Sequence, residues 1–322
     1  MPRTVLITGI TGFAGSHLAE RFVTQGVVVH GIAHEDPPFP HLAAIADRVR
    51  VYRGNILDLS AVRAAVDAAR PDAVVHLAAQ AVPTLAAADP VSAVRVNVLG
   101  TATLLAALEA HPEVRLVMAS SADVYGAPDS ERVDESAPLR PMNVYAATKV
   151  ASEALVREFG DRRDAATTVL RPANQIGPRQ HPGLAASAFA KQIAAAEAGL
   201  AEPVVKHGAL HARRDFLDVR DMAAAYALAT DLTDAGATVY NVGSGQAVPV
   251  AEILETLIGL ARVRMRAELD PERVRSGEPT AFALDAARFR RRTGWAPRTG
   301  LLTSLTDTLE YWRAQVRAEV RA

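Results

Sequence analysis

The chain has 322 residues, 49% of them hydrophobic, so it can bury one large core or two unequal ones. Its 35 Lys and Arg residues nearly balance its 36 Asp and Glu residues, so nothing in the charge suggests a nucleic acid or an anionic membrane as partner. There is no cysteine, which excludes disulfides, thiolate metal sites and a cysteine nucleophile. We therefore expect a soluble cytoplasmic enzyme without a metal centre or a membrane-spanning segment.

The N-terminus has the pattern of a strand, a glycine turn and a helix. An apolar, β-rich run covers residues 4–8, the motif GxxGxxG follows with Gly9, Gly12 and Gly15, and a helical pattern covers 16–25. Such glycines allow a tight turn, close approach of the backbone to a pyrophosphate, and contact between helix and strand. The helix N-terminus also offers backbone amides to the anion. The pattern predicts a dinucleotide site, although an ordinary βα turn can use the same glycines.

Apolar runs and helical patterns alternate along the next part of the chain. We expect strands at 27–33, 49–52, 73–78, 115–120 and 167–170, and helices at 59–69, 93–110 and 144–159. Repeated βα units predict an α/β fold with a Rossmann-type, doubly wound parallel sheet that binds ligands at the carboxyl ends of its strands.

The pattern changes after residue 170. Loops, a helix at 185–198 and strands near 215–217 and 239–242 predict a smaller, interwoven α/β lobe for the substrate. The expected division is 1–170 for the dinucleotide-binding domain and 171–322 for the substrate lobe, with an approximate boundary.

Small and polar residues follow two of the predicted strands. Residues 76–80 would let a flat ligand lie against the backbone, although small residues also suit packing. Ser121 follows the strand at 115–120, so its hydroxyl would lie at the ligand-binding edge. A serine in this place can also simply make a hydrogen bond within a turn.

Tyr145 and Lys149 are four residues apart in the helix predicted for 144–159, so the phenol and the ammonium share one face. A nearby cation stabilises a phenolate, and we expect the pKa of Tyr145 to fall from its usual value of about 10. The pair alone also occurs on ordinary exposed helices. Together with Ser121 at a strand end, it predicts acid–base chemistry.

These segments together resemble the extended short-chain dehydrogenases/reductases, the group of nucleotide-sugar epimerases and dehydratases. The resemblance spans nearly the whole chain and continues through residues 171–178, 213–221 and 240–245. It implies that Tyr145 exchanges a proton with a sugar carbonyl, that Lys149 binds the nicotinamide ribose, and that Ser121 hydrogen-bonds the reacting oxygen. Proteins of this fold can also bind dinucleotide without turnover, but the intact Ser121, Tyr145 and Lys149 argue against that alternative.

The resemblance implies NAD or NADP as the cofactor. The residues assigned to its site are Gly9, Thr11, Gly12, Phe13, Ala14, Gly15, His34, Asn55, Ile56, Leu77, Ala78, Ala79, Asn97, Tyr145, Lys149 and Pro172. The strand ending near residue 33 lacks both the terminal acid that would hold the adenosine ribose of NAD and an arginine for a ribose phosphate. Glu35 could serve NAD and His34 could lie near NADP, or both could belong to a solvated turn, so the preference stays open.

Residues 171–192 resemble the GDP-4-keto-6-deoxymannose reductases within this family. The implied substrate is a GDP-linked 4-keto-6-deoxy sugar, reduced at C4 to GDP-rhamnose. The residues assigned to it are Ser121, Asp123, Asn174, Lys191, Arg214 and Arg275. Guanidinium groups suit a diphosphate, although both arginines could be solvated at the surface.

The related 4,6-dehydratases, which recycle their nicotinamide, need further acid–base groups. Ala122 stands where a second acid of theirs would be, whereas Asp123 fits either activity. The turn after the second strand lacks the long arginine-rich insertion of the mannose dehydratases, which favours a reductase. A dehydratase or an epimerase remains the alternative.

The resemblance also suggests a homodimer in which the helices at 93–110 and 144–159 form a four-helix contact. The alanine-rich faces of these helices could instead serve only the internal core.

Overall fold

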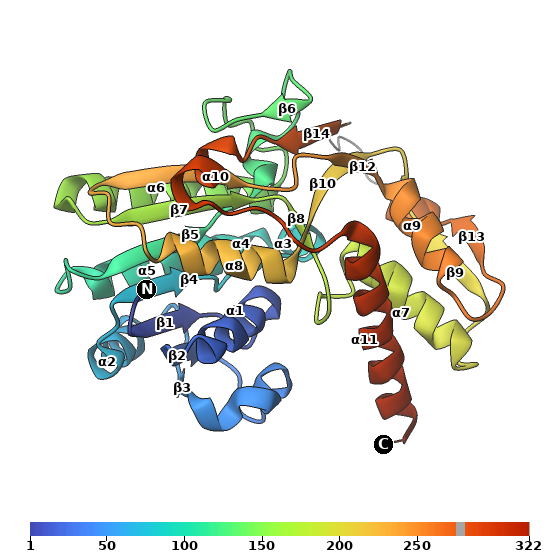
Figure 1. The fold of residues 1–322 in the computed structure, drawn as a ribbon, viewed down its shortest axis with the longest axis horizontal. Helices are drawn as coiled ribbons and strands as arrows, with labels where there is room; N and C mark the ends of the chain where they lie inside the picture. Colours follow the sequence, from blue (N-terminus) through green and yellow to red (C-terminus); the bar gives the residue numbers. More distant parts are fainter. Residues whose placement is uncertain (275–280, 322) are drawn as a thin grey trace.

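The larger sheet of the computed structural model has seven parallel strands in the order β11-β7-β5-β4-β1-β2-β3 (Figure 1). The structure describes residues 1–274 and 281–321. The strands are Thr4–Thr8 (β1), Val28–Ala33 (β2), Val49–Arg53 (β3), Ala73–His76 (β4), Arg115–Ala119 (β5), Thr167–Pro172 (β7) and Ala237–Val242 (β11). The chain order reverses between β1 and β4, so the loops after these strands diverge and leave a crevice at their carboxyl ends. This arrangement confirms the predicted α/β fold.

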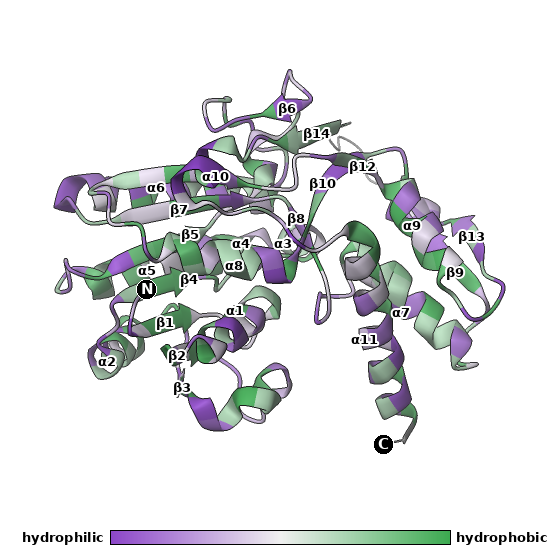
Figure 2. Cartoon of the chain, in the orientation of Figure 1, coloured by the Kyte–Doolittle hydropathy of each residue, from purple (hydrophilic) through white to green (hydrophobic). Residues whose placement is uncertain are grey.

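Helices cover both faces of this sheet, and their buried side chains explain why. Successive residues of a strand point to opposite faces, so Leu6 packs with the cluster beneath one helix layer while Val5 and Ile7 join the other. One layer consists of α2 (Leu59–Ala69), α5 (Gly100–Leu108) and α6 (Val144–Arg163), and the other of α1 (Phe13–Thr24) and α8 (Val219–Ala229). Figure 2 shows hydrophobic residues along β1, β4 and β5, as buried parallel strands require.

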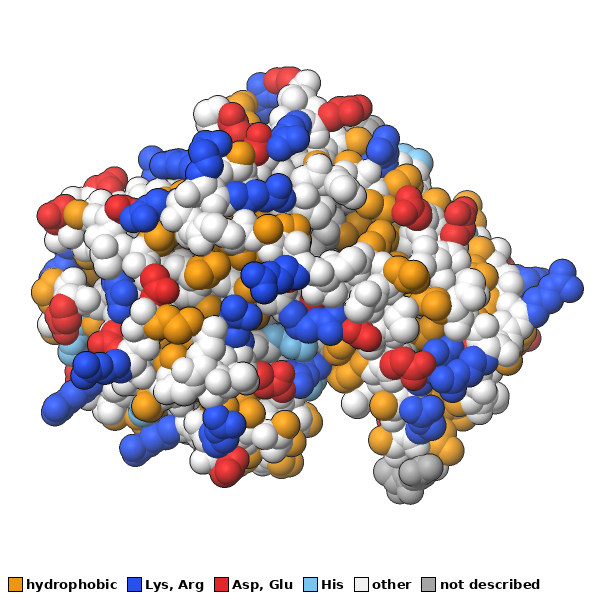
Figure 3. Space-filling model, viewed as in Figure 1, with side chains coloured by type: hydrophobic (Ala, Val, Ile, Leu, Met, Phe, Trp, Pro, Cys, Tyr) orange, Lys and Arg blue, Asp and Glu red, His pale blue; other side chains and the backbone are white. Residues whose placement is uncertain are grey.

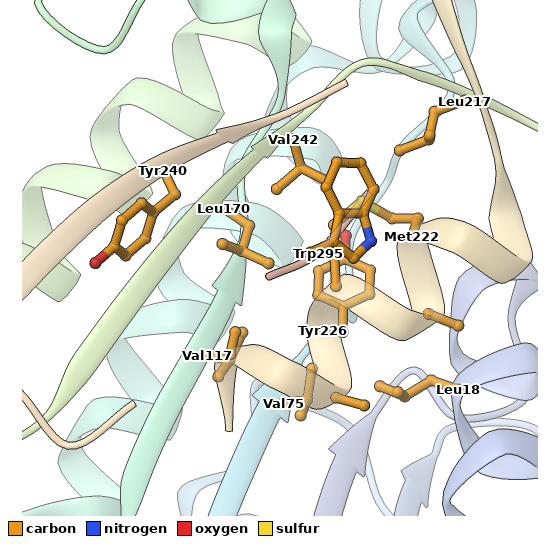
Figure 4. Close-up of a cluster of buried hydrophobic side chains, with 14 of the residues drawn as sticks. Leu18, Val75, Val117, Leu170, Leu217, Met222, Tyr226, Tyr240, Val242 and Trp295 are labelled. Atoms are coloured by element: carbon orange, nitrogen blue, oxygen red, sulfur yellow. The ribbon is translucent and has the colours of Figure 1, made fainter. Parts of the chain in front are cut away.

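The cluster beneath α8 joins the sheet to the second half of the chain. Figure 4 shows Val75, Val117, Leu170 and Val242, which come from four neighbouring strands, pointing toward the side chains of α8. Tyr226 of α8 lies in this cluster and is 1% exposed. This packing fixes α8 on the larger sheet although α8 follows residue 170.

The smaller lobe is built on a second sheet, in the order β12-β10-β14-β6, with β8 also paired to β10. Its strands are Arg132–Val133 (β6), Asn174–Ile176 (β8), Arg213–Asp218 (β10), Ala247–Pro249 (β12) and Ala281–Leu284 (β14). The helices α7 (Ala185–Glu197), α9 (Val250–Gly259) and α11 (Leu301–Arg321) form a separate hydrophobic cluster that includes Trp312. A third, two-stranded sheet joins β9 (Val204–His207) to β13 (Arg266–Leu269).

The two sheets exchange strands, which corrects one part of the sequence-based assignment. The strand near 239–242 was expected in the smaller lobe, but β11 pairs along its whole length with β7 at the edge of the larger sheet. Conversely, β6 comes from the first half of the chain and pairs with β14 in the second sheet. A short run such as Ala237–Val242 can pair in either sheet, so its partner depends on tertiary contacts rather than on its own pattern. The boundary near residue 170 therefore stays a prediction.

The helix predicted for 93–110 belongs to a helical run that begins at Pro90 and is not α-helical throughout. It consists of α4 (Pro90–Val94), a π-helical turn at Arg95–Leu99 (η2) and α5. Within the described residues, 90–108 is also the one helical run that is long and apolar enough by composition to cross a membrane, with 44% of its most apolar window buried. This run is part of the helix layer of the larger sheet, so its composition alone does not overturn the expectation that the chain has no membrane-spanning segment. In this fold the run packs against α2 and α6.

Figure 3 shows cationic and anionic side chains interspersed over one face of the molecule.

Candidate active site

A cleft of about 560 Å³ occupies the crevice between β1 and β4. Nine residues predicted for the cofactor line it, namely Gly9, Thr11, Gly12, His34, Asn55, Ile56, Leu77, Ala78 and Ala79. Further lining residues, which the sequence did not indicate for the cofactor, include Asp89 just before α4, Val91 and Ser92 of α4, and Arg95 and Val96 of the turn η2. Glu35, which the sequence suggested only conditionally, also lines the cleft. The residues gathered here come from four strand ends and one helix, as expected for a doubly wound sheet.

The glycine motif leaves room for a diphosphate at the start of α1. Gly9 has a φ of +71°, which favours glycine, and a Cβ at this position would lie 2.9 Å from the backbone nitrogen of Ala78. A Cβ on Gly15 would overlap the carbonyl oxygen of Gly9. No side chain caps the N-terminus of α1, so its first backbone amides can donate to an anion. The motif thus fits the pyrophosphate of a dinucleotide, with Phe13, Ala14 and Gly15 in the first turn of the helix.

A buried hydrogen-bond network holds the two loops of the cleft together. The Oγ1 atom of Thr8 lies 2.7 Å from Nδ1 of His76 and accepts from the backbone nitrogens of Leu77 and Ala78, each at 3.2 Å. The Thr8 hydroxyl therefore donates its single hydrogen to Nδ1 of His76. The hydrogen of the ring is then on Nε2, which donates to Thr101 Oγ1 at 3.0 Å. Burial, together with the charge of Lys149, lowers the pKa of His76 to about 3, so the ring stays neutral in this network.

Asn97 connects the cleft to the helix that carries Tyr145. Its side-chain Oδ1 accepts from the backbone nitrogen of Gln80 at 2.7 Å, and its Nδ2 donates to Thr148 Oγ1 at 2.8 Å. The π-helical turn leaves its carbonyl oxygen available to two further hydroxyls, those of Thr101 at 2.6 Å and Ser152 at 2.8 Å. Asn97 therefore positions the β4 loop against α6, and although it was assigned to the cofactor site it does not line the cleft.

Ser121 and Tyr145 lie close together at the end of β5. Ser121 begins the short 3₁₀ helix Ala122–Tyr125 (η3), and its Oγ accepts from the backbone nitrogen of Asp123 at 3.1 Å. Burial and the nearby carboxylate of Asp123 raise the pKa of Tyr145, and a hydrogen bond with the Ser121 side chain offsets only part of this rise. The expectation of a lowered pKa is therefore wrong for this structure, because burial of the phenol outweighs any effect of a cation.

Lys149 lies over the aromatic ring of Tyr145, with its Nζ 5.8 Å from the ring centroid, and donates to the carbonyl oxygen of Ala119 at 2.7 Å. Burial lowers the pKa of Lys149 to about 8, and the carboxylate of Glu153, one helical turn later, raises it. The ammonium is thus held at the end of β5, because α6 carries the lysine and the carbonyl oxygen of Ala119 accepts its hydrogen bond.

A buried ion pair that the sequence did not reveal lies behind these groups. Arg171 of β7 donates through Nε to Glu153 Oε1 at 2.9 Å and through Nη2 to Oε2 at 2.7 Å, and both side chains are at most 4% exposed. Ser120 also donates to Glu153 Oε1, and Arg171 Nη1 donates to the hydroxyl of Tyr125 at 2.8 Å.

Pro172, predicted for the cofactor site, follows Arg171 as the last residue of β7 but does not line the cleft.

The residues predicted for the substrate lie mainly in the smaller lobe. Asn174 of β8 pairs with Phe216 of β10, so Asn174 and Arg214 are on adjacent strands. Nη1 of Arg214 donates to the backbone oxygen of Arg213 at 3.0 Å. Lys191 of α7 lies with its Nζ 5.0 Å from the ring centroid of Trp312 and lines a second cleft of about 640 Å³ between α7, β9 and β13. Arg275 is outside the described residues.

The crevice lies at the β1/β4 switch point, and Ser121, Tyr145 and Lys149 lie together at the end of β5, the strand next to β4. These three residues do not line the cleft itself. A dinucleotide crevice beside a serine, a tyrosine and a lysine is typical of a short-chain dehydrogenase/reductase. A sequence profile described as GDP-mannose 4,6 dehydratase matches residues 6–308. The chain belongs to this family of extended short-chain dehydrogenases/reductases and is an NAD(P)-dependent enzyme that acts on nucleotide sugars.

Three comparisons describe its relatives. The GDP-6-deoxy-D-mannose reductase of Pseudomonas aeruginosa is 33% identical over 99% of this chain and 100% of its own. The solved structure of RMD from Pseudomonas aeruginosa in complex with NADPH has a TM-score of 0.84 at 30% identity and covers 97% of this chain and 99% of that one. A Thermus thermophilus UDP-glucose 4-epimerase in complex with NAD also has a TM-score of 0.84 at 30% identity, covering 96% and 98%.

The neutral state of His76 predicts a specific dependence of stability on pH. Its pKa is about 3 in the folded protein and 6.5 in an unperturbed histidine, so between these values the unfolded chain binds a proton that the folded chain does not. Folding stability should therefore fall as the pH drops below about 6.5, by at most about 1.4 kcal/mol per pH unit from this one group. His76→Asn should make the fall in the free energy of unfolding between pH 7 and pH 5 shallower, measured by urea titration. The exposed His211→Asn is the control, and an equal change in both variants would contradict the assignment.

Proposed function

We propose that the enzyme uses a reduced nicotinamide cofactor, NADPH or NADH, to reduce the C4 ketone of GDP-4-keto-6-deoxy-D-mannose, giving GDP-D-rhamnose in the cytoplasm. The similarity to the Pseudomonas aeruginosa GDP-6-deoxy-D-mannose reductase, which spans nearly the whole of both chains, supports the choice of substrate. The absence of a long insertion between β2 and β3 agrees with this choice.

The observation that carries the proposal is the grouping of Ser121, Tyr145 and Lys149 at the end of β5, in a chain similar over its full length to a reductase. Burial and the carboxylate of Asp123 raise the pKa of Tyr145, so its phenol holds its proton. A phenol in this position can donate that proton to a ketone oxygen, as a reduction requires.

Each of the catalytic residues has its own role in the proposed reduction. The reduced nicotinamide supplies the hydride when it is bound. Tyr145 donates its phenolic proton to the oxygen of the C4 carbonyl as negative charge develops there, and the Ser121 hydroxyl hydrogen-bonds the same oxygen. Lys149, whose pKa is about 8, is charged at neutral pH and stabilises the phenolate that remains. One hydride and one proton convert the ketone to an alcohol, and solvent returns the proton to Tyr145.

Binding of the GDP part is assigned to the smaller lobe. We infer that Asn174 contacts the sugar, that Arg214 pairs with the diphosphate, and that Lys191 lies near the nucleotide. The position of Arg214 on β10, next to the strand that carries Asn174, supports its proposed role at the diphosphate. Arg275, proposed as a second diphosphate ligand, lies outside the described residues.

A 4,6-dehydratase or epimerase that recycles its nicotinamide is the alternative function. The profile described as GDP-mannose 4,6 dehydratase favours it, and Asp123 is placed beside Tyr145 where a carboxylate could take part in elimination. Ala122, which has no acidic group, argues against a site with two carboxylates.

The test is the loss of reduced-nicotinamide absorbance when the purified protein meets GDP-4-keto-6-deoxymannose. Stoichiometric loss with NADH or NADPH, and formation of a GDP-6-deoxyhexose, are expected for the reductase. A protein that binds the cofactor but gives no loss, while it converts GDP-mannose to the 4-keto sugar, would establish the dehydratase instead.

Replacement of Tyr145 by Phe removes the proton donor but keeps the aromatic ring. Turnover should fall by at least about 100-fold, since a positioned general acid contributes at least that much. Cofactor affinity, measured by fluorescence titration, should change only modestly. Tyr240→Phe, at a buried tyrosine of β11, is the matched control. Near-normal turnover in the Tyr145 variant would remove Tyr145 from the chemistry.

We further propose a homodimer through the outer faces of η2, α5 and α6. Leu99 of η2 is 51% exposed, and Ala147 and Ala154 of α6 are also exposed, so an apolar surface remains on this side of the helix layer. Leu99→Glu should make the protein monomeric, as judged by the molar mass from light scattering, because it would place a charge in an interface from which water is excluded. Leu302→Glu is the matched control at an exposed leucine of α11. A wild-type protein that is already monomeric would contradict the proposed homodimer.

A further inference from the structure

The cleft ends, beyond the glycine motif, at the carboxyl ends of β2 and β3. These strands pair in register, with Ala33 opposite Arg53, so the residues that follow them lie side by side. His34 and Glu35 after β2, and Asn55 after β3, all line the cleft. In a doubly wound sheet this end receives the adenosine ribose of a dinucleotide, and a carboxylate there selects the free 2′-hydroxyl.

The carboxylate of Glu35 is held over the glycine turn. Its Oε2 accepts a hydrogen bond from Thr11 Oγ1 at 3.0 Å, and Thr11 belongs to the GxxGxxG motif. The side chain is 49% exposed, so its other oxygen can accept from a ligand in the cleft. The carboxylate therefore reaches the ribose end of the cleft although β2 ends at Ala33, two residues earlier.

Two basic side chains near this end face carboxylates. Arg53 forms an ion pair with Asp36, with Nε 2.9 Å from Oδ1. Nδ1 of His34 lies 3.5 Å from Oε2 of Glu35. Arg95 also lines the cleft and comes from the turn η2. A ribose 2′-phosphate would thus bring its negative charge close to two carboxylates.

We propose that Glu35 accepts hydrogen bonds from the vicinal hydroxyls of the adenosine ribose and makes the enzyme select NAD(H) over NADP(H). The hydroxyls of an unphosphorylated ribose are donors that match a carboxylate, whereas a phosphate dianion is repelled by it. This selection differs from the NADPH complex of the similar Pseudomonas aeruginosa enzyme. The inference rests on the cofactor cleft alone and does not depend on which sugar is the substrate.

The test is the direct binding of NADH and NADPH in the absence of sugar, by fluorescence titration, with Glu35→Gln as the variant. Wild-type protein should bind NADH at least about tenfold more tightly than NADPH, since the carboxylate acts at short range on a doubly charged group. Glu35→Gln keeps the shape but removes the charge, so NADPH binding should tighten, NADH binding should weaken several-fold, and the ratio should approach one.

Two further variants separate the local effect from other causes. Asp47→Asn removes one carboxylate from an exposed position outside the cleft and should leave the ratio at the wild-type value. Arg95→Ala should weaken both cofactors equally or not at all. Wild-type preference for NADPH, an unchanged ratio in Glu35→Gln, or selective loss of NADPH binding in Arg95→Ala would each overturn the proposal. Melting temperatures show that each variant is folded, and a failed sugar assay would leave this result unaffected.

Discussion

The buried ion pair between Glu153 and Arg171 is the interaction on which the geometry of the active site depends. It joins α6, which carries Tyr145 and Lys149, to β7 at the centre of the region where the two lobes meet. The network extends to the hydroxyl of Tyr125, which donates to Asn241 Oδ1 of β11 at 2.7 Å. Removing either partner of such a pair leaves an uncompensated buried charge, which costs about 3–5 kcal/mol. The position of the catalytic helix is therefore tied to the strand crossing that makes the lobes interwoven.

Burial around this ion pair also determines the charges in the site. The same closely packed environment that lowers the pKa of Lys149 raises that of Tyr145, because each charged form is removed from water. Glu153 counteracts the first effect and Ser121 the second. The result is a neutral phenol beside an ammonium, which suits the delivery of a proton to a developing alkoxide. A spacing of four residues between Tyr and Lys thus establishes proximity, while the direction of the pKa shifts comes from the surrounding protein.

Local patterns in the sequence were enough for the repeating βα units, the glycine motif and the residues at the ends of β1, β4 and β5. They failed where the outcome depends on contacts far apart in the chain. The six residues of β11 carry no mark that distinguishes one sheet from the other, and β6 is only two residues long. Glu153 and Arg171 looked like ordinary charged residues, since nothing local shows that a charge is buried. The π-helical turn at Arg95–Leu99 was hidden within an apolar helical pattern for the same reason.

The residues assigned to the two ligands belong to different parts of the fold. The dinucleotide crevice arises from the larger sheet alone, where the chain order reverses between β1 and β4. Of the residues assigned to the nucleotide sugar, Asn174, Arg214 and Lys191 lie instead on β8, β10 and α7, which belong to the smaller lobe. Since β8 follows β7 after one intervening residue, the strand that ends beside the catalytic groups leads directly into the sheet assigned to the substrate. A change in substrate preference can thus occur in the smaller lobe without moving the cofactor cleft or the proton donor.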